Sequence, residues 1–87
     1  MDQEKVKGQP ERQRPTVGRI VHFVMPSGEH RPAIVVARWS DTCVNLQVFT
    51  DGSNDVGSPT DRPLWETSVT LDETAKAPHS WHWPERE

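Results

Sequence analysis

Side chains able to bind an anionic or nucleobase-bearing ligand occur through the middle of this 87-residue chain. Guanidinium groups form paired hydrogen bonds with phosphates, indole rings stack on bases, and amides and hydroxyls bind polar edges. The candidate ligand-binding residues are Arg38, Trp39, Asn45, Gln47, Thr50, Asn54, Arg62 and Trp65. A second interpretation stays open, because Trp39 and Trp65 are also suited to a core and exposed strand arginines often only keep a sheet edge soluble.

The candidate metal ligands are the four histidines, His22, His30, His79 and His82. His79 and His82 form a His-x-x-His pair, a spacing that can bring two imidazoles to one metal. In an extended segment, however, residues three apart point to opposite sides. We expect His22 in a strand wall and His30 in a turn. The sequence therefore predicts no metal site and no cofactor.

No catalytic arrangement is evident in the sequence. Asp51, Asn54 and Asp55 offer oxygen ligands, but they lack the Asp-x-Asp-x-Asp-Gly order and the terminal glutamate of an EF-hand, so an Asx-turn role is favoured. Cys43 has no base or oxyanion donor near it in the sequence, which favours a small apolar side chain over a nucleophile. We predict that the protein is not an enzyme.

Strands must position the candidate residues. The runs at 16–25, 32–40 and 43–50 are rich in β-branched and aromatic residues, and Pro26-Ser27-Gly28 separates the first two as a tight turn. The third run alternates, which puts Val44, Leu46 and Val48 on one face and leaves Phe49 on the other, polar face.

A long loop is predicted at 51–63, where Gly, Pro and Asp are concentrated. The fourth strand follows, with Trp65, Thr67, Val69 and Leu71 expected on one face. Trp81 and Trp83 are two residues apart, so both rings point to the same side of an extended segment. We expect them to clamp the end of the chain onto the fold.

Composition limits the size and setting of the domain. Only 32% of the residues are hydrophobic, and the single cysteine excludes an intrachain disulfide. A formal charge of −3 argues against sequence-independent binding to duplex nucleic acid, which depends on many contacts between basic side chains and phosphates. With no membrane-length apolar run and no signal-peptide pattern, we expect a protein of the cytoplasm.

These elements predict an all-β fold, a small SH3-like antiparallel barrel or roll, because closure removes the exposed edges of so small a sheet. We expect one domain at 16–87 behind a disordered arm at 1–15, whose charged, apolar-poor composition cannot offset its chain entropy. Homo-oligomerisation through the polar face of the third strand would cover Phe49.

Four segments together resemble a family of small uncharacterised bacteriophage and prophage proteins. They begin at Val17 (VGRIVHF), His30 (HRPAIVV), Asn45 (NLQVFTDG) and Trp81 (WHWP). The resemblance implies a viral accessory role, inside the infected cell or in the phage particle. It brings no assigned chemistry with it.

Two functions from different classes follow as expectations. The first is a non-enzymatic binding module that sequesters a small, nucleotide-like immune signal of the host as a homo-oligomer, an idea that rests on analogy with other oligomeric phage β-folds. The alternative is a protein-interaction module, either a particle component or an inhibitor that docks on a host protein.

We predict that residues 1–14 are dispensable for folding. Deleting them should leave the thermal midpoint almost unchanged, because a charged arm with few apolar residues adds little to a core. Thermal denaturation of the shortened and full chains tests this. A loss of more than a few degrees would show that the arm packs on the domain.

Overall fold

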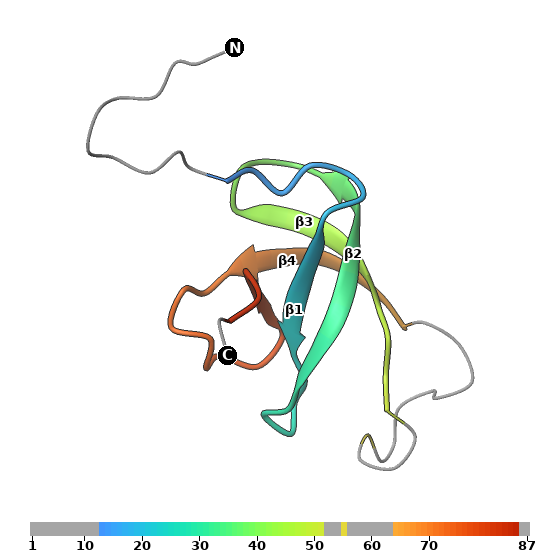
Figure 1. The fold of residues 1–87 in the computed structure, drawn as a ribbon, viewed down its shortest axis with the longest axis vertical. Helices are drawn as coiled ribbons and strands as arrows, with labels where there is room; N and C mark the ends of the chain where they lie inside the picture. Colours follow the sequence, from blue (N-terminus) through green and yellow to red (C-terminus); the bar gives the residue numbers. More distant parts are fainter. Residues whose placement is uncertain (1–12, 52–54, 56–63, 86–87) are drawn as a thin grey trace.

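The computed structural model describes residues 13–51, 55 and 64–85. These residues form five strands: β1 (Ile20–Val24), β2 (His30–Arg38), β3 (Cys43–Val48), β4 (Leu64–Leu71) and β5 (Ser80–His82). Neighbours in sequence are neighbours in the sheet, and β5 returns to β1 to close a barrel (Figure 1). The prediction of an all-β, SH3-like barrel is confirmed. In the described part of the chain, no helix has the length and hydrophobicity needed to cross a bilayer.

The five strands cannot all be antiparallel. Alternating directions around a ring require an even number of strands, so one neighbouring pair in this barrel must be parallel. That pair is β4 and β5, whereas β1 is antiparallel to both β2 and β5. Residues 72–79 form the connection that returns the chain to the start of β5.

Two glycine turns set the ends of β1. Gly18 and Gly28 have φ angles of 95° and 94°, a region that glycine enters without steric cost. The amide of Gly28 donates to the carbonyl of Met25 at 2.8 Å, as expected for the predicted turn. β1 and β2 form a long hairpin that crosses β3 and β4 steeply (Figure 1). His30, expected in the turn, is instead the first residue of β2.

The core consists of apolar side chains from all five strands and from Met25, which follows β1. Its members are Val21, Phe23, Met25, Ala33, Val35, Val44, Leu46, Val48, Val69 and Trp81. Trp81 is fully buried, and its indole nitrogen donates to the carbonyl of Thr42 at 3.0 Å. The ring of Trp83 packs edge-on against that of Trp81, at 5.3 Å between centroids. The two tryptophans therefore fasten the end of the chain to the barrel, as predicted.

A β-bulge corrects the predicted facing of the fourth strand. Leu46 pairs with Glu66 and Val44 pairs with Val69, so two residues of β4 lie opposite Asn45 of β3. Ser68, one of the two, has a φ of 55°. The extra residue reverses the alternation of side chains along β4. Trp65 was expected on the same face as Val69 and Leu71, but its side chain lies on the outside, 58% exposed.

The predicted arm falls mostly outside the described residues. Residues 1–12 are not described, and Pro15, which was expected to be the last residue of a disordered arm, is buried.

Trp81→Ala should destabilise the domain by about 3–5 kcal/mol, because truncating a buried aromatic side chain leaves a cavity. Trp65→Ala is the matched control, since Trp65 is largely exposed; its effect should stay within about 0.5 kcal/mol. Urea denaturation followed by circular dichroism measures both. Equal stabilities for the two variants would contradict the assignment of Trp81 to the core.

Candidate functional site

Gln47 and Trp65, two of the predicted ligand-binding residues, lie in one row on the outside of the barrel. Gln47 of β3 pairs with Ile34 of β2 on one side and with Trp65 of β4 on the other. Direct partners across neighbouring strands share a face of the sheet. The exposure of Trp65 identifies this face as the outer one.

Asn45 holds Trp39 beside this row. The side-chain oxygen of Asn45 accepts hydrogen bonds from the indole nitrogen of Trp39 at 2.9 Å, the hydroxyl of Thr67 at 3.0 Å and the backbone amide of Ser68 at 2.8 Å. Asn45 itself is only 7% exposed, whereas Trp39 is 64% exposed. The bulge that turns Thr67 and Ser68 toward Asn45 therefore fixes an exposed indole ring. Trp39 does not belong to the core.

The exposed apolar surface extends beyond the tryptophans. Val36 and Phe49 are 40% and 43% exposed, and the amide of Phe49 bonds to the carbonyl of Pro32 in the neighbouring strand. We call the side chains of Val36, Trp39, Gln47, Phe49 and Trp65 the outer face. Phe49 is thus exposed in the single chain, as the sequence predicts.

Three arginines with described side chains, Arg19, Arg31 and Arg38, already have partners. Arg38 binds Asp41 at 2.8 Å, and Arg31 binds Asp55 through two nitrogens at 2.8 and 3.0 Å. The bond from Arg31 lowers the pKa of the buried Asp55 carboxyl, although desolvation opposes this, and the same bond raises the pKa of Arg31. Asp55, considered above as a calcium ligand, is an ion-pair partner instead. Arg19 lies over the ring of Trp83, with its guanidinium carbon 4.8 Å from the centroid.

The other predicted residues are placed less fully. Thr50 follows Phe49 and is half-buried. Asn54 and Arg62 lie outside the described residues.

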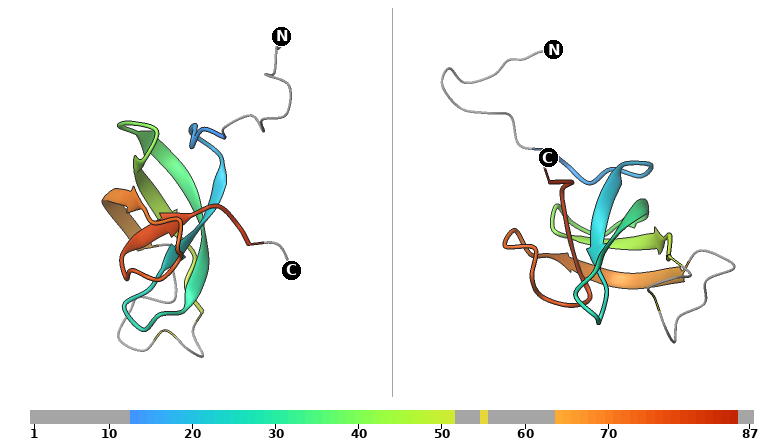
Figure 2. Two further views of the ribbon diagram at one scale, coloured as in Figure 1. Left: turned by 90° about the vertical axis from the view of Figure 1, so that its left-hand side faces the viewer. Right: turned by 60° about the horizontal axis from the view of Figure 1, so that its bottom comes forward.

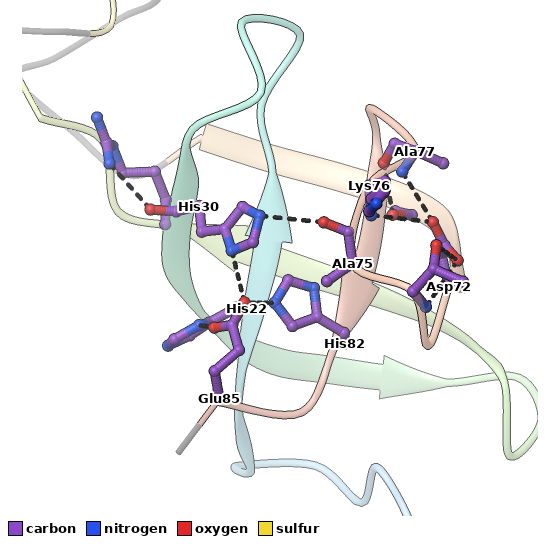
Figure 3. A network of polar contacts seen from close by, with 11 residues as sticks. His22, His30, Asp72, Ala75, Lys76, Ala77, His82 and Glu85 are labelled. Atoms are coloured by element: carbon purple, nitrogen blue, oxygen red, sulfur yellow. Dashed lines mark hydrogen bonds and ion pairs between the residues drawn. The ribbon is translucent and has the colours of Figure 1, made fainter. Parts of the chain in front are cut away.

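A second group of polar residues, whose convergence the sequence did not predict, lies on the wall formed by β5, β1 and β2 (Figure 3). We call His22, His30, His82 and Glu85 the histidine cluster. His22 and His82 are direct partners across β1 and β5. His30 pairs with Val24, two residues along β1 from His22, and so is its diagonal neighbour.

Glu85 is the centre of the histidine cluster. Its carboxylate oxygens lie 2.9 Å from Nδ1 of His22, 2.8 Å from Nδ1 of His30 and 3.0 Å from Nε2 of His82. The segment after β5 passes over the outside of the barrel and brings Glu85 to this position (Figure 2). Three strands and the segment beyond them are thereby joined at one carboxylate.

The electrostatics of the cluster keep Glu85 ionised. Partial burial alone would raise its pKa, but the hydrogen bond from His22 and the charges of His82 and His30 outweigh this and lower the pKa to about 2. Desolvation is the main reason that the pKa of His82 is lowered, because its side chain is only 4% exposed. Nδ1 of His82 is buried, and no group among the described residues forms a hydrogen bond with it.

The connection between β4 and β5 holds one member of the cluster, His30, through a backbone carbonyl. Asp72 accepts hydrogen bonds from the hydroxyl of Thr74 and the amides of Thr74, Lys76 and Ala77, an Asx-type arrangement that shapes the turn. The carbonyl of Ala75 in this turn accepts a hydrogen bond from Nε2 of His30 at 3.1 Å (Figure 3). His30 is therefore held with its Nδ1 toward Glu85.

His79 does not join the cluster. Its ring packs edge-on against Phe23, and its Nε2 lies 3.4 Å from Glu66. The His79-x-x-His82 pair thus does not converge, as the sequence predicts. The alternation of side chains along β1 and β2 places His22 and His30 on the outside of the barrel, which is a hint of the cluster. The hint can be used only when β5, which carries His82, is known to pair with β1.

Comparison of the chain with protein-family models, with curated proteins and with solved structures finds no match.

Asn45→Ala should destabilise the domain by about 1–3 kcal/mol, because it truncates a buried side chain whose oxygen accepts three hydrogen bonds. It should also release the indole of Trp39. Gln47→Ala, on the same strand, is the control and should stay within about 0.5 kcal/mol. Urea denaturation and the tryptophan emission spectrum measure the two effects. If Asn45→Ala matched the parent in both, the proposed anchoring of Trp39 would be wrong.

Proposed function

We propose that this protein is a non-enzymatic binding module that docks on a partner protein through the outer face. The observation that carries the proposal is the pair of exposed indoles, Trp39 and Trp65, on either side of Asn45 and Gln47. Tryptophan is enriched among the residues that dominate protein interfaces, where charged residues are depleted from the centre.

Pre-organisation favours binding at this face. The ring of Trp39 is already held by Asn45 in the free protein, so less side-chain entropy is lost when a partner covers it. Because the barrel is closed, a partner must bind through side chains and not through the backbone of an unpaired strand. Every described strand has a neighbour on both sides, so strand addition at a free edge is not the mode of binding that this fold supports.

A nucleotide-like ligand is the second candidate, because exposed indoles beside amide side chains suit the stacking of a base. The arginines weaken it, since Arg31 and Arg38 already bind carboxylates. The resemblance to bacteriophage proteins extends both proposals to a viral accessory role, inside the infected cell or in the phage particle. If the partner protein is a second copy of this chain, the product is a homo-oligomer in which that copy covers Phe49 and the rest of the outer face.

The test compares the tagged full chain with its Trp39→Ala and Trp65→Ala variants. Each substitution should weaken partner binding by about 2 kcal/mol, or roughly 30-fold in Kd, if these rings are central to the interface. Partners are captured from phage-infected cells, identified by mass spectrometry, and their affinities measured with purified protein. Lys76→Ala is the control, since Lys76 is exposed and lies in the connection between β4 and β5, beside the histidine cluster.

A small ligand or a second copy of the chain at the outer face would give different results. A thermal shift with a nucleotide library that disappears in Trp65→Ala would favour the small ligand. Light scattering that shows an oligomer in the parent and a monomer in Trp65→Ala would make the partner a second copy. Partner binding that survives both tryptophan substitutions would overturn a docking role for the outer face.

A further inference from the structure

The histidine cluster has the composition of a transition-metal site. Three imidazoles and one carboxylate converge, and one ligand atom from each of the four residues lies within 4.8 Å of the others. Imidazole and carboxylate are ligands for zinc, whereas magnesium and calcium take oxygen ligands. The grouping is independent of the outer face and of the partner proposed for it.

The hydrogen-bonding pattern of the cluster favours a bound metal ion. Each contact with Glu85 needs a proton on the facing nitrogen, because a carboxylate only accepts hydrogen bonds. His30 already donates through Nε2 to Ala75, so its Nδ1 contacts Glu85 as a donor only if the ring is a cation. A metal ion removes this requirement. Neutral imidazoles then direct lone pairs at the ion, and the carboxylate becomes the fourth ligand.

The surroundings match those of a bound metal. Histidine ligands usually donate their second ring proton to a backbone carbonyl or a carboxylate, which fixes the tautomer and the ring orientation. The bond from His30 to Ala75 does this, and Asp72 stabilises the turn that presents Ala75. His82 is nine-tenths buried, while the side chains of His22 and His30 are 26% and 32% exposed. The cluster is thus rigid on one side and accessible from the other.

We propose that His22, His30, His82 and Glu85 bind one Zn²⁺ ion, which fastens the segment after β5 to the barrel wall. Tetrahedral zinc with bonds of about 2.0–2.1 Å places its ligand atoms about 3.4 Å apart, so ligand atoms that now lie up to 4.8 Å apart must draw together when the ion binds. The four protein ligands fill the tetrahedron, which makes the role structural. A small domain without a disulfide gains the staple that its limited core does not supply.

The experiment uses the full chain, stripped of metal with a chelator and dialysed. Calorimetric titration with Zn²⁺ should give one ion per chain, and a hundredfold excess over Kd should raise the thermal midpoint by roughly 10 °C or more. His22→Ala and Glu85→Gln should each weaken Zn²⁺ binding by more than the about 10–100-fold that loss of an outer-shell partner costs. His79→Ala removes a histidine outside the cluster and should bind Zn²⁺ like the parent.

Co²⁺ gives a readout that does not depend on stability. In a tetrahedral site it should give intense visible absorption bands in the parent and in His79→Ala, displaced by Zn²⁺, and weak bands in the two ligand variants. Mg²⁺ at the same concentration should leave the midpoint unchanged. Absence of Zn²⁺ binding by the parent, or equal binding by all the variants, would overturn the site.

Discussion

An odd number of strands forces one parallel pair on this barrel, and much of the molecule follows from where that pair lies. Because β4 and β5 run in the same direction, the chain must travel back along the barrel through residues 72–79 before β5 begins. Asp72 organises that return with its own carboxylate. The result is a short final strand that meets β1, covers the core with Trp81 and brings His82 beside His22.

The two groups of polar and aromatic residues have different structural origins. The outer face depends on the bulge opposite Asn45, which turns Trp65 outward and supplies the donors that hold Asn45 in place. The histidine cluster depends on barrel closure and on the segment that carries Glu85. β2 contributes to both, through Val36 at one end and His30 at the other. The proposed partner and the proposed metal ion would therefore occupy different walls of the barrel.

The local patterns of the sequence predicted the architecture well. β-branched runs and the turn at Pro26-Ser27-Gly28 predicted the strands of the hairpin, and strict alternation predicted the burial of Val44, Leu46 and Val48. The facing of Trp65 could not be predicted, because the bulge leaves no local mark when both residues opposite Asn45, Thr67 and Ser68, are polar. The histidine cluster was missed for a different reason: His22 and Glu85 are 63 positions apart, and only the pairing of β1 with β5 brings them together.

The place of β5 in the chain order also affects how the protein matures on the ribosome. β1 is synthesised first among the strands, but one of its two hydrogen-bonding neighbours is synthesised last. At about 5–20 residues per second, the nascent sheet waits some seconds with one side of β1 unpaired and Phe23 without the cover of β5. During that interval the open edge is exposed to other nascent chains, so chaperone contact at β1 would protect the molecule most before its last strand emerges.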